Sequence, residues 1–241
     1  MKKLGVSILL CCFVLSITNV AMSQLYFEDN FDNPNKSEDK WVPLWGDWQF
    51  KDDEYQQLLN DANCITIVAD DYWDDDWVEY TYEVRANKID GAEAFLIMFR
   101  CQGEINPRDK DLAELPPRMK GKPLFEYWWN LGGWGNSVSR IEAWNGAAYK
   151  QAGDSNHTFE TNKWYSIKIV NTPTSYTLIL DDEEVHEIAD ADKDGVGRIG
   201  IGTWNTTAKY EDVLVYGPGG PLPVDPKGKV ATAWGFLKAG R

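Results

Sequence analysis

The stretch WVEYTYEVR, residues 77–85, carries the pattern that decides the fold. Its apolar residues recur at every second position, at 78, 80, 82 and 84, and a polar or charged residue stands between each pair of them. Successive side chains of a strand point to opposite faces, so this spacing is typical of a strand with one buried and one solvated face. The stretch therefore predicts a half-buried β-strand.

Similar short runs continue along the chain. AFLIMFR, residues 94–100, is apolar on both faces and predicts a central strand. Further runs cover residues 126–130, 138–144, 164–170, 175–180, 183–188, 198–204 and 210–216, and Asp181-Asp182 predicts a hairpin turn. There is no convincing amphipathic helix of three turns. We expect one all-β domain over residues 24–217, built as a two-sheet antiparallel sandwich.

Both ends of the chain differ from this pattern. Residues 1–23 begin with Lys2 and Lys3, continue with an apolar run and end in small residues, as a signal peptide cleaved before Gln24 does. A membrane anchor is the alternative, but the apolar run is shorter than the roughly 20 residues that span a bilayer. We expect a secreted, periplasmic or cell-surface protein without membrane insertion after cleavage. Residues 218–228 predict a Pro/Gly linker before a tail, 229–241, whose role stays open.

Charge and cysteine content narrow the ligands. Without residues 1–23 the chain has 22 basic and 38 acidic residues, a formal charge of −16, which disfavours nucleic acid and anionic membranes as partners. Neutral or cationic ligands and calcium remain. Cys64 and Cys101 are compatible with a disulfide or with two buried thiols. The chain has only two histidines, and its cysteine spacing does not predict a zinc site.

The stretch YWWNLGGWGN, residues 127–136, is the richest in aromatic side chains and glycines. Alternation directs Tyr127 and Trp129 into the core and their neighbours to the other face. With the adjacent strands, that second face is predicted to carry Arg100, Glu126, Trp128, Asn130, Arg140, Glu142 and Trp144, with Trp134 and Asn136 on a glycine-rich loop at its rim. Aromatic rings that stack on a sugar and planar groups that bind its hydroxyls suit a saccharide. Ordinary cross-strand ion pairs are the alternative.

Several stretches also resemble a known family. FRCQ, EYWWNLGGWGNSVSRIEAWNG, NKWYSIKIV, LDDEEVHE and GRIGIGTWNTTAKYEDVLVY are similar to the concanavalin A-like jelly roll of the 3-keto-disaccharide hydrolase domain. They also resemble the laminin-G-like sandwich attached to some secreted α-L-arabinofuranosidases. The resemblance implies a jelly roll over about residues 25–217. It leaves the function open, because this fold hosts enzymes, carbohydrate-binding modules and adhesion domains.

Three functions follow as expectations. The first is a secreted carbohydrate-binding domain with an aromatic groove. The second is a glycoside hydrolase with Glu126 and Glu142 as its carboxylate pair, although the E-x-D-x-x-E stretch of laminarinase-type jelly rolls is missing. A salt-bridge network with Arg100 and Arg140 is the competing interpretation of these carboxylates. The third is an adhesive or structural surface domain. Related jelly-roll modules also imply a structural Ca²⁺, with candidate ligands Glu28, Asp29 and Asp212.

Overall fold

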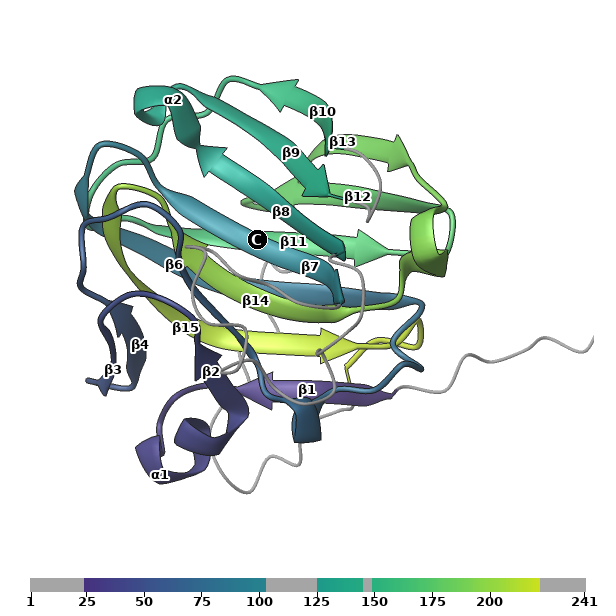
Figure 1. The fold of residues 1–241 in the computed structure, drawn as a ribbon, viewed down its shortest axis with the longest axis horizontal. Helices are drawn as coiled ribbons and strands as arrows, with labels where there is room; N and C mark the ends of the chain where they lie inside the picture. Colours follow the sequence, from purple (N-terminus) through teal and green to yellow (C-terminus); the bar gives the residue numbers. More distant parts are fainter. Residues whose placement is uncertain (1–23, 103–124, 145–148, 222–241) are drawn as a thin grey trace, which may run out of the picture.

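The computed structural model describes residues 24–102, 125–144 and 149–221. The predicted signal peptide, the tail and most of the predicted linker lie outside these residues. Within them the chain folds into two antiparallel β-sheets packed face to face (Figure 1). The predicted all-β, two-sheet jelly-roll sandwich is therefore confirmed.

The strand order of each sheet places the elements. In the described residues the first sheet has the order β13 (Glu183–Ala189), β12 (Ser175–Leu180), β11 (Trp164–Asn171), β6 (Tyr80–Gly91), β15 (Thr206–Tyr216), β4 (Glu54–Gln57), β3 (Trp48–Lys51), and β1 (Leu25–Asp29) also pairs with β15. The second has the order β10 (Tyr149–Ser155), β9 (Val138–Trp144), β8 (Phe125–Gly132), β7 (Phe95–Gln102), β14 (Arg198–Thr203), β5 (Cys64–Val68), β2 (Trp41–Pro43). Short helical turns are α1 (Pro34–Ser37), η1 (Glu38–Lys40), η2 (Asp70–Tyr72), α2 (Gly133–Asn136) and η4 (Asp192–Gly195).

The core lies between the sheets and follows from alternation. Tyr80, Tyr82 and Val84 of β6 are buried, as the opening stretch predicts, although the strand begins at Tyr80 and not at Trp77. Tyr127 and Trp129 of β8 are also fully buried, which confirms their predicted core position. The predicted central strand is β7, which lies between β8 and β14. Aromatic rings fill much of this core, and burial of each large apolar side chain contributes about 2 kcal/mol to folding.

A second apolar cluster lies on the outer face of the second sheet, meaning the face directed away from the core. Its buried members are Ile65, Ile67, Leu96, Met98 and Cys101, with Val42, Leu44, Trp128 and Trp204 packed against them. They lie on β2, β5, β7 and β8, except that Leu44 directly follows β2 and Trp204 directly follows β14. The outer face is thus apolar and buried over β5 and β7, whereas over β8, β9 and β10 it carries polar groups together with half-buried or exposed aromatic rings.

Cys64 and Cys101 are both buried thiols in the structure. Cys64 Sγ lies 3.4 Å from the carbonyl of Leu59, and Cys101 Sγ lies 3.4 Å from that of Phe99. Burial raises the pKa of the Cys101 thiol, which keeps it protonated. Of the two arrangements compatible with the sequence, the structure therefore has two thiols and not a disulfide.

In the part of the chain that the structure describes, no helix has the length and apolar content needed to cross a membrane.

Candidate saccharide-binding face

The loop between β8 and β9 holds Trp134 in a left-handed backbone conformation. Gly132, Trp134, Gly135 and Asn136 have φ values of 63°, 51°, 73° and 61°. Gly132 is required, because a Cβ there would lie 2.6 Å from the Asn136 side chain. For a bulky residue such as tryptophan this backbone conformation costs about 1–2 kcal/mol. Trp134 is nevertheless 47% exposed, so burial does not offset the cost. Strain of this kind is concentrated at functional sites.

Two side chains hold this loop in place. The Asn136 side-chain amide donates to the Phe159 carbonyl at 2.9 Å, and its oxygen accepts from the Phe159 N–H at 2.9 Å. Glu93 Oε1 accepts from the Gly135 N–H at 3.4 Å. Burial raises the pKa of Glu93, and the nearby charge of Glu142 raises it further. The loop is therefore fixed before any ligand arrives.

Arg140 supports the Trp134 ring. The guanidinium carbon lies 4.3 Å from the centre of the ring, a cation–π distance. Arg140 also donates to Asp154 Oδ2 at 2.9 Å and to Gln151 Oε1 at 3.3 Å. Because one ring face rests on a guanidinium that is itself fixed, the exposed remainder of the ring forms a rigid stacking surface.

Glu142 is the centre of the polar part of the face. Its Oε2 accepts from Asn130 Nδ2 of β8 at 3.0 Å. Its Oε1 accepts from Gln151 Nε2 of β10 at 3.4 Å and from the hydroxyl of Tyr149. Neighbours on both sides thus orient one carboxylate and leave hydroxyl and amide groups at the surface. A sugar with several hydroxyls needs such paired donors and acceptors.

The far end of β9 carries a second aromatic group. Trp144 is 39% exposed and pairs across the strands with Tyr149, which is 53% exposed. Glu126 of β8 lies opposite Trp144 and is half-buried. Burial raises the pKa of Glu126 to about 7. This end of the face therefore combines two open rings with a carboxyl group that ionises near neutral pH.

The predicted position of Arg100 on this face is wrong. The β7–β8 register shifts between Phe99 and Gln102, and Arg100 has a φ of 51°, so alternation breaks at this residue and its side chain turns to the interior. Gly197 permits the bend, because a Cβ there would lie 2.2 Å from the Arg100 backbone. Arg100 is fully buried and donates to Asn171 Oδ1 at 2.7 Å.

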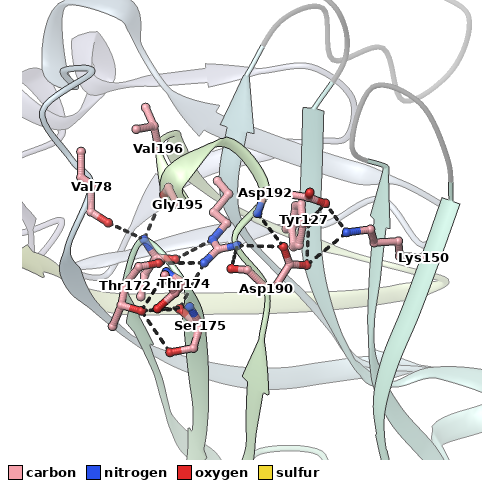
Figure 2. Close-up of polar contacts among 12 residues, drawn as sticks. Val78, Tyr127, Lys150, Thr172, Thr174, Ser175, Asp190, Asp192, Gly195 and Val196 are labelled. Atoms are coloured by element: carbon pink, nitrogen blue, oxygen red, sulfur yellow. Dashed lines mark hydrogen bonds and ion pairs between the residues drawn. The ribbon is translucent and has the colours of Figure 1, made fainter.

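The buried guanidinium belongs to a closed polar cluster, the Arg100 network, which comprises Arg100, Tyr127, Lys150, Asn171, Thr172, Ser175, Asp190 and Asp192. Arg100 donates to the carbonyls of Thr172 at 2.9 Å and Ser175 at 3.1 Å. Figure 2 shows Asp190 with Thr172 and Ser175 on one side and Tyr127 and Lys150 on the other. The network joins the two sheets beneath the outer face.

The competing interpretation of Glu126 and Glu142 as salt-bridge partners of Arg100 and Arg140 is also wrong. The ion pairs of the two arginines go to Asp190 and Asp154. Among the described residues, no lysine or arginine forms an ion pair with either glutamate.

The three predicted calcium ligands, all within the described residues, do not form a metal-binding group. Asp29 accepts hydrogen bonds from Ser37 Oγ at 2.8 Å and Trp41 Nε1 at 3.0 Å, whereas half-exposed Asp212 lies 4.0 Å from Arg85. Glu28 alternates with Asp29 along β1 and is exposed. In the described part of the chain, no group of three or more His, Cys, Asp or Glu side chains has a metal-binding arrangement.

Sequence reasoning missed part of the face. Tyr149, Gln151 and Asp154 lie on β10, a polar strand whose pattern is weak, and Glu93 lies in the turn between β6 and β7. The predicted residues Glu126, Trp128, Asn130, Trp134, Arg140, Glu142 and Trp144 do lie together on β8, β9 and their connecting loop. Asn136 is next to them, but its amide is occupied by Phe159. These β10 residues could be identified only from the pairing of β10 with β9, which places Gln151 opposite Glu142 and Tyr149 opposite Trp144.

One family model and one characterised protein are similar in sequence to part of the chain. The model of a domain of unknown function, DUF6250, matches residues 119–213. An extracellular exo-alpha-L-arabinofuranosidase of Streptomyces chartreusis is 29% identical over 150 residues, which cover 60% of this chain and 15% of that protein. The chain thus corresponds to a small part of this relative.

Solved structures with a similar fold include the carbohydrate binding module CBM66 from Bacillus subtilis, with a TM-score of 0.52 and 19% identity over 73% of this chain and 94% of that one. A lichenase from a mouse hindgut metagenome has a TM-score of 0.52 and 13% identity, over 80% of this chain and 98% of the lichenase chain. The beta-glucanase of Bacillus licheniformis has a TM-score of 0.54 and 12% identity, over 79% of this chain and 97% of the glucanase chain. At these identities the likeness shows the shared jelly-roll fold alone.

Proposed function

We propose that the outer face along β8, β9 and β10 binds a saccharide, and that the protein is an exported carbohydrate-binding domain. The exposed Trp134 ring carries the proposal, because a strained backbone, Glu93, Asn136 and Arg140 all hold it in place without burying it. Sugar recognition combines stacking on such a ring with hydrogen bonds from nearby planar groups. Glu142, Gln151 and Tyr149 supply these groups.

The names of similar proteins support this proposal. One structure of the same fold is a carbohydrate-binding module, two are glucanases, and the sequence relative is an extracellular arabinofuranosidase. The narrower resemblance to the 3-keto-disaccharide hydrolase domain adds 3-keto-glycosides to the saccharides worth testing.

A glycan array followed by calorimetric titration of each hit tests the proposal. The wild-type domain is expected to bind at least one saccharide, and Trp134→Gly to weaken binding at least about tenfold. Tyr72→Ala is the matched control, because Tyr72 is 36% exposed and lies on η2, away from β8–β10. Absence of binding to every glycan would favour an adhesive or structural surface domain instead.

Hydrolysis of the bound saccharide is the second candidate function, and the carboxyl groups of Glu126 and Glu142 favour it. They lie diagonally on adjacent strands, because Glu126 pairs with Trp144 and Glu142 pairs with Trp128. Diagonal neighbours on adjacent strands lie about 7–8 Å apart, with their Cβ atoms somewhat closer. A pKa of about 7 would suit Glu126 to protonate a leaving group, while Glu142 would act as base.

Product release from oligosaccharides and 3-keto-glycosides separates the two functions. If the domain is a hydrolase, Glu126→Gln and Glu142→Gln each abolish release, and kcat falls as the pH rises through about 7 because the acid loses its proton. If the wild-type protein binds the saccharide and releases no product, the domain has the binding function and not the hydrolase function.

Export is part of the proposal. We expect residues 1–23 to direct secretion and the mature chain to begin at Gln24. N-terminal sequencing of protein recovered from outside the cytoplasm tests this expectation, and a chain that retains residues 1–23 would contradict it.

A further inference from the structure

The exposed aromatic side chains of the face fall into two groups at opposite ends of β9. Trp134 rests on Arg140 at the beginning of the strand, and Trp144 with Tyr149 lies at its end. Arg140 and Trp144 are four residues apart, which in a strand is about 13 Å. This separation is longer than one sugar ring.

The polar groups lie between these two ends. Glu142 is midway between Arg140 and Trp144 on the same face of β9. Its cross-strand neighbours are Trp128 of β8 and Gln151 of β10, and Asn130 of β8 donates to it. Along β9 the face therefore has three parts, a ring surface at each end and, between them, a hydrogen-bonding centre beside the half-buried Trp128 ring. Rings that stack and polar groups that form hydrogen bonds are both elements of ligand sites, so each of these parts is available to a different sugar unit.

Burial sets the direction of the ligand. Toward β7, β14 and β5 the outer-face side chains Leu96, Met98 and Ile67 are fully buried, so a ligand cannot contact them. In the opposite direction β10 is the last strand of the sheet among the described residues. The accessible part of the face is thus narrow across the strands and long along them.

Charge sets the ligand class. Glu93, Glu126, Glu142 and Asp154 surround the face, and the guanidinium of Arg140 is already paired with Asp154. A sugar acid would bring its negative charge close to these carboxylates, and like charges at short range are unfavourable. A neutral saccharide carries no such cost.

We propose that the face takes a neutral oligosaccharide lying along β9, long enough to stack on Trp134 and on the Trp144–Tyr149 pair at the same time. This inference rests on the proposed saccharide binding and adds the length, direction and charge of the ligand. It predicts that affinity rises with chain length until both ring surfaces are covered.

Titration with a length series tests the inference. The probes are arabinose and its oligomers up to the tetrasaccharide, the same series of β-1,3/1,4-linked gluco-oligosaccharides, and oligogalacturonides as the charged comparison. In the neutral series that binds, the tetrasaccharide is expected to bind at least about tenfold tighter than the monosaccharide, and the oligogalacturonide not to bind.

The variants Trp134→Gly and Trp144→Ala locate the effect. Each is expected to lower tetrasaccharide affinity about tenfold, whereas at most one of them lowers monosaccharide affinity. Equal binding of monosaccharide and tetrasaccharide, or tight binding of the oligogalacturonide, would overturn the inference and leave saccharide binding in place. Failure of every saccharide to bind would overturn both.

Discussion

The Arg100 network and the outer face of β8–β10 contain the same kinds of residue and have opposite properties. In the network, the Arg100 guanidinium is fully buried and its hydrogen bonds go to Asn171, Thr172, Ser175 and Asp190. On the outer face, Arg140 is also hydrogen bonded, but it supports a tryptophan that is 47% exposed. Arginine, carboxylate and aromatic side chains therefore form a buried contact between the two sheets in the Arg100 network and an exposed surface on β8–β10. Exposure, and not composition, distinguishes the two.

Removing the guanidinium is expected to give the largest effect. Arg100→Met leaves Asp190, Asn171 and two carbonyls without their buried donor, which should lower the free energy of unfolding by about 3–5 kcal/mol. Arg100→Lys should be nearly as harmful, because an ammonium group cannot replace the planar fork. Chemical denaturation measures both. A loss below about 1 kcal/mol for Arg100→Met would show that the network does not hold the sheets together.

Glu126 should make stability depend on pH. Its folded pKa of about 7 lies above the ordinary value, so the folded protein binds more protons than the unfolded chain between about pH 4.5 and 7. The free energy of unfolding is then highest below about pH 4.5. It falls by about 1–3 kcal/mol as the pH rises from there through about 7.

Denaturation at pH 5 and pH 8 measures this slope. Glu126→Gln should flatten it and leave the protein more stable than wild type at pH 8. Glu183→Gln, which removes an exposed carboxylate on the other sheet, is the matched control and should retain the slope. If Glu126→Gln does not change the dependence of the free energy of unfolding on pH, another group causes that dependence.

Trp134→Gly separates binding from stability. Glycine adopts the left-handed backbone without strain, which offsets the lost contact with Arg140. We expect the free energy of unfolding to change by less than about 1 kcal/mol, while saccharide affinity falls at least about tenfold. A stability loss of several kcal/mol would identify Trp134 as a structural residue.

The smallest expected effect comes from Tyr149→Phe, which removes one hydroxyl that donates to Glu142 and keeps the ring. Loss of one exposed hydrogen bond should weaken saccharide binding about threefold, and stability should not change measurably. Tyr149→Ala also removes the ring beside Trp144 and should weaken binding further. Equal affinities of the two variants would show that the ring contributes nothing.

Alternation in the sequence predicted the fold and most of the outer face. It places Tyr127 and Trp129 in the core, and it gathers Trp128, Glu142 and Trp144 on the other side, as the structure has them. It fails at Arg100 because one residue of β7 breaks the period of two, and a bulge has no clear signature in AFLIMFR.

Other parts of the face depend on tertiary contacts that the sequence does not reveal. Glu93 reaches Gly135 from a turn some 40 residues earlier, a contact that no local pattern contains. The glycines of the loop indicated an unusual backbone correctly, but not that Asn136 would bind Phe159 and leave Trp134 as the exposed residue. Register and long-range partners therefore separate the structural residues from the binding residues.

A two-dimensional NMR titration with a saccharide selected on the array tests directly whether the outer face of β8–β10 binds it. The titration follows the tryptophan indole N–H signals, assigned by single substitutions. The signals of Trp134 and Trp144 are expected to shift as the saccharide is added, whereas those of the buried Trp73 and Trp77 are not. Shifts confined to indoles away from β8–β10, or none at saturating saccharide, would contradict the claim that this face is the binding site.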